Sequence, residues 1–234
     1  MVQLDSIANI RMGTTLRGRD ATRSVASGSC RLVRIGDVSQ DGTWLNEVFA
    51  RIEPAENLRE DQFLQDGDVL FPNRGNRTTA IAYRLDVSRA LAGAQFFVLR
   101  PVQAKVLPEY LAWYLRAEES VRYFEERRKG TYVPIIQRSD LAELKIPLPS
   151  LTVQRTIVEI DALAVEEHDL AMQLAASKLK LLNGQLVEAA KNTDKGKNKD
   201  KHGQTKTDTD TRADKDTDRR RDTDKDTRTK EDSL

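Results

Sequence analysis

The side chains best suited to bind a nucleic acid lie in one short segment, Pro72 to Thr79, between two apolar runs. Within this segment Arg74, Asn76 and Arg77 follow one another closely. An Arg guanidinium can bind a guanine edge or a phosphate through two hydrogen bonds, and an Asn amide can pair with adenine. This composition predicts a DNA-reading hairpin, with these three residues as candidates for contacting base edges.

A second basic group ends a predicted helix and continues beyond Gly130. We expect its members to contact the DNA backbone or bases: Arg127, Arg128, Lys129, Thr131 and Tyr132. A third group, Arg17, Arg19 and Arg23, lies in a polar loop rich in Gly and Thr. Any one group alone is explained more simply as a solvated loop, and cations at a helix end are expected from the helix dipole. Three such groups on one chain favour DNA binding.

One short motif could instead support a metal-dependent nuclease. Asp140 is followed by the Glu-x-Lys pair of Glu143 and Lys145, and such nucleases use an acidic residue with a pair of this kind to hold a metal ion. Matches of this length arise by chance, and the carboxylates stand where a helix cap would place them. The nuclease remains an alternative.

No other motif indicates an enzyme. The sequence contains no Gly-x-x-x-x-Gly-Lys, Gly-x-Gly-x-x-Gly or Asn-Pro-Pro-aromatic segment, which argues against ATP hydrolysis and base methylation by this chain. The one cysteine, Cys30, and the two histidines, His168 and His202, have no partners at metal-ligand spacing. We therefore expect no metal site, no disulfide framework and no cofactor.

The charge of the chain is nearly balanced, with a formal net charge of +1 over 234 residues. DNA contact would therefore depend on local basic patches. Residues 191–234 hold 14 Lys and Arg and 12 Asp and Glu with almost nothing apolar, so we expect a disordered charged tail. No apolar window is long enough to span a membrane, and the N-terminus lacks a basic stretch before an apolar run, which predicts a cytoplasmic protein.

The rest of the chain has the pattern of an α+β fold with short, mostly antiparallel strands. Apolar runs separated by turn residues predict strands at Leu32–Val38, Trp44–Ile52, Val69–Phe71, Thr79–Leu85 and Phe96–Val102. Helical spacing from Pro108 to Gly130 predicts one helix, because Pro suits a first turn and Gly a C-terminal stop. A strand over Thr131–Ile136 and a helical turn near Ser139, with Glu143 placed to cap it, complete the prediction.

After Ser150 the apolar spacing becomes long and helical. A helix from Thr152 to Ala190 would be about 57 Å long, which a domain of this size cannot cover. Its apolar stripe resembles an imperfect coiled-coil seam, interrupted at Glu167 and Ser177, and predicts dimerisation through Ile160, Leu163, Leu170, Leu174 and Leu181. The alternative is a helix folded back onto its own domain.

The order of these segments resembles the specificity (S) subunits of type I restriction-modification systems, here in a half-length form with a single target-recognition domain. The resemblance spans most of residues 1 to 165. Its pieces are Leu4-Asp-Ser-Ile-Ala-Asn-Ile10, Val33-Arg-Ile-Gly-Asp-Val38, Leu64-Gln-Asp-Gly-Asp-Val-Leu70, Phe96-Phe-Val-Leu-Arg-Pro101, Pro108-Glu-Tyr-Leu-Ala-Trp-Tyr-Leu115, Asp140-Leu-Ala-Glu-Leu144 and Ile146-Pro-Leu-Pro-Ser-Leu-Thr-Val-Gln154.

The resemblance implies a non-catalytic DNA reader in phage defence. Such a subunit places a separate adenine methyltransferase, and through it a translocating nuclease subunit, on a bipartite site of double-stranded DNA. It also implies a target-recognition domain over residues 1–149 followed by a dimerisation or spacer helix over 150–190. The composition adds a disordered low-complexity tail over 191–234.

Two departures bear on the partners of this chain. The family's usual chain holds two recognition domains and two helices, and this one holds a single copy of each. The common Pro-Pro-Leu-x-Glu-Gln at the helix start is here Pro149-Ser-Leu-Thr-Val-Gln154. The helix would therefore pair with a second copy or with a different half-subunit. A stand-alone DNA-binding or adaptor protein is the alternative.

Overall fold

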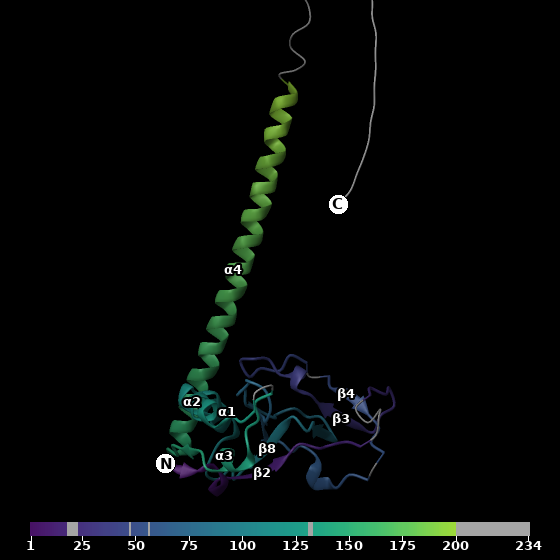
Figure 1. The fold of residues 1–234 in the computed structure, drawn as a ribbon. Coiled ribbons are helices and arrows are strands. Elements are labelled where there is room, and N and C mark those ends of the chain that lie inside the picture. The colour runs from purple at the N-terminus through teal and green to yellow at the C-terminus, as the bar shows by residue number, and fades with distance from the viewer. Residues whose placement is uncertain (18–22, 47, 56, 131–132, 200–234) are drawn as a thin grey trace, which may run out of the picture. The chain divides into compact units, whose positions relative to one another are not determined.

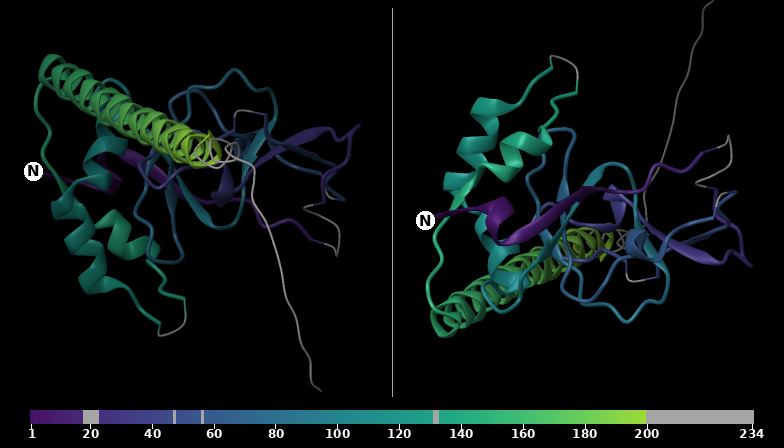
Figure 2. Two further views of the ribbon diagram at one scale, coloured as in Figure 1. Left: turned by 90° about the horizontal axis from the view of Figure 1, so that it is seen from above. Right: turned by 90° about the horizontal axis from the view of Figure 1, so that it is seen from below.

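The computed structural model describes residues 1–17, 23–46, 48–55, 57–130 and 133–199 (Figure 1). The chain divides into a unit of Met1–Gln173 and a unit of Leu174–Leu234, which we describe separately. In the first unit the helices α1, α2 and α3 gather at the end that carries the N-terminus, and strands β3 and β4 lie at the other end (Figures 1 and 2).

Three small sheets form within the described residues of the first unit, and they confirm the expected mostly antiparallel α+β fold. A four-stranded antiparallel sheet has the order β2-β8-β5-β6, with bounds Ala8–Met12, Phe96–Pro101, Val69–Pro72 and Ile81–Ala82. A three-stranded sheet has the order β4-β3-β7, with bounds Ala50–Ile52, Cys30–Val33 and Ala90–Ala92, and its β3–β7 pair is parallel. The third pairs β1 (Val2–Gln3) with β9 (Lys145–Ile146).

The four-stranded sheet is buried on both faces, which explains the unbroken apolar run of β8. Side chains alternate between the faces of a strand. Phe97 and Leu99 belong to the core cluster that includes α1 and α2, whereas Phe96 and Val98 belong to the cluster with Tyr83 and Phe49 on the opposite face. The sheet is therefore a rigid base for the loops that leave its ends.

Within the part of the chain that the structure describes, four helices follow the sequence pattern, except that one predicted helix is divided in two. They are α1 (Pro108–Arg116), α2 (Glu118–Arg127), α3 (Arg138–Ala142) and α4 (Leu151–Lys199), and three short 3-10 turns lie at Leu4–Ser6, Ile35–Asp37 and Glu60–Gln62. The single helix expected from Pro108 to Gly130 is wrong, because Ala117 has an extended backbone and ends α1. The break lets Phe124 of α2 turn back and pack against Phe71, with ring centroids 4.9 Å apart.

Several strand boundaries also differ from the sequence-based expectations. The run from Leu32 ends at Val33, since the next residues form the 3-10 turn Ile35–Asp37. Of the runs Trp44–Ile52 and Thr79–Leu85, only Ala50–Ile52 and Ile81–Ala82 are strands. The described part of the expected strand at 131–136 makes isolated pairings instead. Glu143 does not cap α3, because Asp140 accepts the Gln137 amide at 3.2 Å in its place.

A buried glutamine fixes the start of α4. The side chain of Gln154 is fully buried, and its Oε1 accepts the Leu107 amide at 2.9 Å. Its Nε2 donates to the carbonyl oxygens of Lys105 at 3.0 Å and Pro149 at 2.9 Å. One side chain thus joins the first turn of α4 to the chain before α1 and to the segment that enters the helix.

The long C-terminal helix is confirmed and runs past its expected end. α4 begins at Leu151 and extends beyond Ala190 to Lys199, so the first part of the expected disordered tail is helical. The remainder of that tail, residues 200–234, lies outside the described residues. None of the helices in the described part of the chain is long and apolar enough to cross a membrane.

Candidate nucleic-acid interface

The segment from Asn73 to Arg77, which we call loop 73–77, leaves the end of β5 with alternating anchored and exposed residues. Asn73 is 2% exposed, and its amide and side chain donate to the carbonyl oxygens of Gln95 and Ala94, each at 2.9 Å. Gly75 has a φ of +81°, a conformation that suits Gly. Arg74, between these anchors, and Asn76, directly after them, are exposed. A residue that contacts DNA must be exposed.

The loop between α2 and α3, residues 128–136, pairs directly with loop 73–77. The Gly75 amide donates to the Pro134 carbonyl oxygen at 2.8 Å, and the Ile136 amide donates to the Asn73 carbonyl oxygen at 3.1 Å. Arg74 and Lys129 each form an isolated antiparallel bridge with Ile135. Loop 73–77 and the described residues of loop 128–136, which carry members of two basic groups that are separate in the sequence, therefore lie against each other; we call them the joined loops.

Arg77 faces into the protein and not toward solvent. Its Nη1 donates to the Ile35 carbonyl oxygen at 3.1 Å, and its Nη2 donates to the carbonyl oxygens of Val38, at 2.6 Å, and Ser39. These acceptors belong to the segment that follows β3. The hydrogen bonds occupy the donors that base readout would need, so the geometry disfavours the sequence-based assignment of Arg77 as a base reader.

The three cations at the end of α2 and directly after it have different surroundings. Arg128 Nη2 donates to the Arg77 carbonyl oxygen at 3.1 Å. Burial lowers the pKa of the Arg128 guanidinium, and the nearby carboxylate of Glu125 opposes that shift. Arg127 lies over the Tyr123 ring, 3.8 Å from its centroid. Lys129 is exposed, with its Nζ 3.5 Å from Gln137 Oε1, and is the cation of this group best placed to meet a phosphate.

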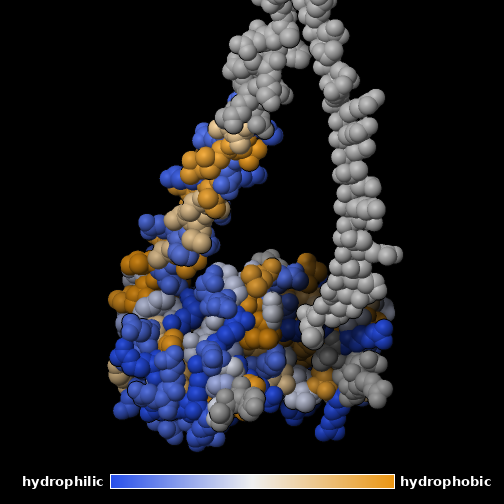
Figure 3. Space-filling model, turned by 45° about the horizontal axis from the view of Figure 1, so that its top comes forward, coloured by the Kyte–Doolittle hydropathy of each residue, from blue (hydrophilic) through white to orange (hydrophobic). Residues whose placement is uncertain are grey.

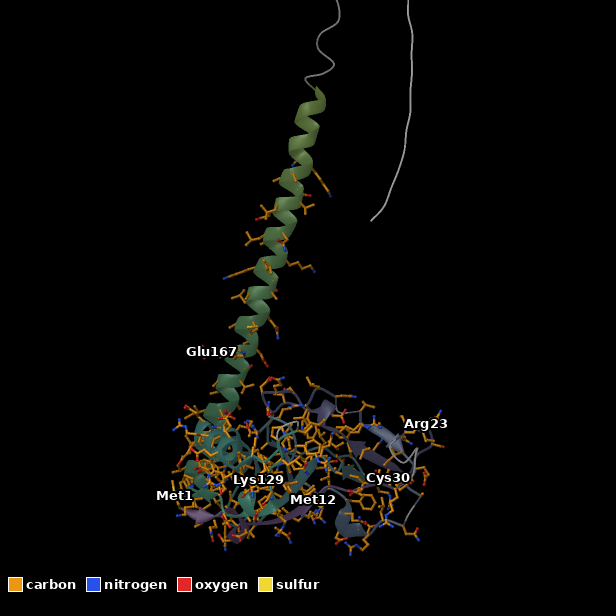
Figure 4. All side chains as sticks on the ribbon, viewed as in Figure 1. Met1, Met12, Arg23, Cys30, Lys129 and Glu167 are labelled. Carbon is orange, nitrogen blue, oxygen red and sulfur yellow. The ribbon has the colours of Figure 1, made fainter. Side chains whose placement is uncertain are left out.

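Three remaining members of the predicted basic groups, Arg19, Thr131 and Tyr132, lie outside the described residues. Arg17 and Arg23 are exposed. Figure 4 shows Arg23 at the far end of residues 1–149 from Lys129. The structure therefore does not bring Arg23 to the joined loops.

Sequence reasoning missed apolar residues on the joined loops. Val133 and Ile135 are 54% and 43% exposed, and Ile135 pairs with Lys129 and Arg74, although the expected strand at 131–136 implied that such residues would be buried. Met12, at the end of β2, is 48% exposed, and its Sδ accepts the Asn73 amide group at 3.8 Å. Exposed apolar side chains in a basic surface can contact thymine methyl groups. The only sequence signal for Val133 and Ile135 was the apolar run directly after Gly130.

The residues of the nuclease alternative serve structural purposes in α3 and β9. The Asp140 carboxylate caps α3, Glu143 is exposed at the end of that helix, and Lys145 pairs with Gln3 in the β1–β9 sheet. Over the residues that the structure describes, no group of three or more His, Cys, Asp or Glu side chains could hold a metal ion. Nothing in this geometry favours the nuclease.

The predicted seam of α4 is exposed along its length, as Figure 3 shows for the apolar residues of the helix. The exposed fractions of its members are 60% for Ile160, 64% for Leu163, 58% for Leu170, 56% for Leu174 and 63% for Leu181. In the first unit the seam is therefore not folded back onto residues 1–149, and it is free to pair with another helix.

A second exposed apolar stripe accompanies this seam. Met172 is 61% exposed and follows Leu163 by about two and a half helical turns, which places the two on opposite sides of α4. Further exposed apolar residues follow Met172 at the same steps of three, four and seven that the first seam has: Leu179, Leu182 and Leu186. Sequence reasoning passed over this stripe.

Three solved structures are similar to this chain, and the first of them supports the fold. A structure of a type I restriction-modification system has 21% sequence identity over 80% of this chain and 43% of its own, with a TM-score of 0.56. The S subunit from M. genitalium has 17% identity over 71% of this chain and 38% of its own, with a TM-score of 0.46. The HsdS subunit from Thermoanaerobacter tengcongensis has 20% identity over 74% of this chain and 38% of its own, with a TM-score of 0.49.

This chain thus spans less than half the length of each of these three proteins. No curated protein matches it at a significant level. The model of one protein family, described as the type I restriction modification DNA specificity domain, matches residues 1–161. That match takes in the four-stranded sheet, both joined loops and the start of α4, and the chain belongs to this family.

Proposed function

We propose that this chain recognises a DNA sequence as the half-length specificity subunit of a type I restriction-modification system. The observation that carries the proposal is the pairing of loop 73–77 with residues 128–136, because it presents Arg74, Asn76 and Lys129 together on one surface. Arg and Asn side chains read base edges, and Lys side chains neutralise phosphates. The family match to residues 1–161 supports the same function.

The division of labour follows from the surroundings of each residue. Arg74 and Asn76 would read bases, Lys129 would contact the backbone, and Arg127 is available for a backbone contact from its stacked position on Tyr123. Thr131 and Tyr132 remain proposed contacts on sequence grounds. The chain itself would be non-catalytic and would place a methyltransferase, and through it a translocating nuclease, on the DNA.

Pairing through α4 would complete the bipartite site. Residues 1–149 would form the recognition domain and residues 150–190 the spacer, with the exposed seam of Ile160, Leu163 and Leu170 packing against a second copy or another half-subunit. An antiparallel pair of long helices would hold two recognition domains at a fixed separation. Two identical copies related by a two-fold axis would read two identical half-sites in an interrupted palindrome.

The experiment that tests this function is a map of adenine methylation in host DNA. The methyltransferase encoded nearest to this chain is expressed alone, with the full chain, and with the Glu143→Ala chain. We expect methylation at one defined sequence only when the chain is present, and the same sequence with Glu143→Ala, because Glu143 lies outside the joined loops. Methylation that is absent throughout, or identical without the chain, would contradict the proposal.

The same experiment distinguishes a stand-alone DNA-binding protein from a specificity subunit. Such a protein would bind a defined DNA sequence in vitro and would leave the methylation pattern unchanged. A nuclease would cleave DNA by itself when Mg²⁺ is added and would lose that activity with Glu143→Ala.

A further inference from the structure

Arg77 connects three separate segments of the chain. Its guanidinium donates to the carbonyl oxygens of Ile35, Val38 and Ser39, and its own carbonyl oxygen accepts a hydrogen bond from Arg128. The segment 35–39, loop 73–77 and the start of loop 128–136 therefore meet at this one residue. Thr79 adds a further link, since its Oγ1 donates to the Gln40 carbonyl oxygen at 2.8 Å.

These contacts hold the C-terminal end of the loop that carries the proposed base readers. The N-terminal end is held by Asn73 and the middle by the Gly75 amide, so Arg77 is the third anchor in an alternating pattern. With all three anchors in place, Arg74 and Asn76 have little backbone freedom to lose when DNA binds. Preorganisation of this kind lowers the entropic cost of binding.

The same anchors shape the groove beside the loop. A groove of about 690 Å³ is lined by Ile35, Gly36 and Asp37 on one side and by Ala94 and Gln95 on another. Arg77 binds the Ile35 carbonyl oxygen, and Asn73 binds the carbonyl oxygens of Ala94 and Gln95. Both walls of the groove are therefore attached to loop 73–77, which makes the loop and the groove one surface.

We infer that Arg77 is a positioning residue for DNA readout: it fixes the loop that carries Arg74 and Asn76 and contacts no DNA itself. This inference rests on the proposed function. It replaces the sequence-based expectation that Arg77 reads bases. It predicts that specificity for DNA depends on the geometry of the Arg77 guanidinium fork and not on its positive charge.

The Arg77→Lys variant separates these two properties. A Lys ammonium keeps the charge, but it lacks the planar fork of donors that reaches Ile35, Val38 and Ser39 together. If Arg77 contacted a phosphate, Lys would replace it with little loss. If Arg77 positions the loop, Lys fails to restore it, and the specificity ratio for DNA falls at least tenfold while the salt dependence of binding is unchanged.

The probes are the duplex that the wild-type full chain enriches from a random pool and a scrambled duplex of the same composition. Binding of both is measured over a range of salt concentrations for the wild type, Arg77→Lys and Arg77→Ala. We expect both variants to lose specificity and to keep the wild-type salt slope. A fall in the slope of about one in Arg77→Ala, with rescue by Lys, would identify a direct phosphate contact and overturn the inference.

Hydrogen exchange of the free protein tests the same inference without DNA. We expect peptides covering residues 34–41 and 73–79 to exchange faster in Arg77→Lys, with no change in the β2–β8 pair. The matched control is Arg74→Lys, whose exposed side chain anchors nothing that the structure describes. It should leave both peptides at the wild-type rate. Unchanged exchange in Arg77→Lys would overturn the inference.

A milder variant covers the case in which Arg77→Lys does not fold. Thr79→Val removes the hydroxyl that bonds Gln40 while keeping the side-chain volume, and it should speed exchange in the same two peptides by a smaller factor. A wild-type chain that enriches no DNA sequence would refute the proposed function, and the exchange measurements would still decide whether Arg77 holds the loop.

Discussion

Arg74 and Arg77 are the same type of residue, three positions apart, in opposite surroundings. Arg74 is exposed between two anchored residues, whereas Arg77 donates to three main-chain carbonyl groups of another segment. Residue type and spacing predicted loop 73–77 as the candidate interface, and that assignment stays a prediction. They could not predict which Arg faces solvent, because that depends on carbonyl groups about forty positions away in the chain.

We expect substitutions of two exposed cations, Arg74 and Lys129, to give different defects in DNA binding. Arg74→Ala should relax sequence choice, with a loss of about 1–3 kcal/mol on the best duplex and little on a scrambled one. Lys129→Ala should weaken binding to every duplex alike and reduce the salt slope by about one, because it removes a phosphate contact. Titration of both duplexes at several salt concentrations measures this, and equal losses in the two variants would refute the division.

The helices and strands differ in how far the sequence could predict them. The position of α1, the start of α4 and the central strands β5 and β8 were predictable from apolar spacing and turn residues. The break at Ala117 was not, since it arises from the packing of Phe124 against Phe71, which lies far away in the chain. The pairing of residues 128–136 with loop 73–77 was missed for the same reason, so the two basic groups looked separate.

Gln154 gives the strongest prediction for a single element. Gln154→Ala would leave the Leu107 amide and the carbonyl oxygens of Lys105 and Pro149 without their buried partner. We expect the free energy of unfolding to fall by about 2–4 kcal/mol, since each lost hydrogen bond costs about 1 kcal/mol. Urea unfolding of the full chain at one protein concentration measures this.

The control for this prediction is the neighbouring Arg155→Ala. Arg155 is exposed on the same turn of α4, and its substitution should change the free energy of unfolding by less than about 0.5 kcal/mol. Equal effects in the two variants would show that Gln154 does not secure the start of the helix.

At the scale of the whole molecule, α4 has two exposed apolar stripes, and either of them could form the proposed dimer seam. The sequence predicted the first stripe because its members are leucine-rich and spaced by three, four and seven. The second stripe, from Met172 to Leu186, is spaced by the same steps. Composition alone could not choose between them, because both faces of the helix are exposed in the single chain.

Two charged substitutions on opposite sides of α4 distinguish the stripes. The chain has a mass of 26.4 kDa, so a dimer has a mass of about 53 kDa by two-fold pairing. We expect Leu163→Glu to give the monomer mass by light scattering on a size-exclusion column, and Met172→Glu to keep the dimer mass. The reverse result would move the seam to the second stripe, and a monomeric wild-type chain would exclude pairing of two copies.

The symmetry of the DNA sequence that the full chain enriches from a random pool tests most directly whether two copies of this chain read one site. Two recognition domains related by a two-fold axis should enrich an inverted repeat of one half-site with a fixed spacer, because the paired α4 helices set a single separation. A single unpaired half-site, a variable spacer or no enriched sequence would contradict recognition by a pair of half-length specificity subunits.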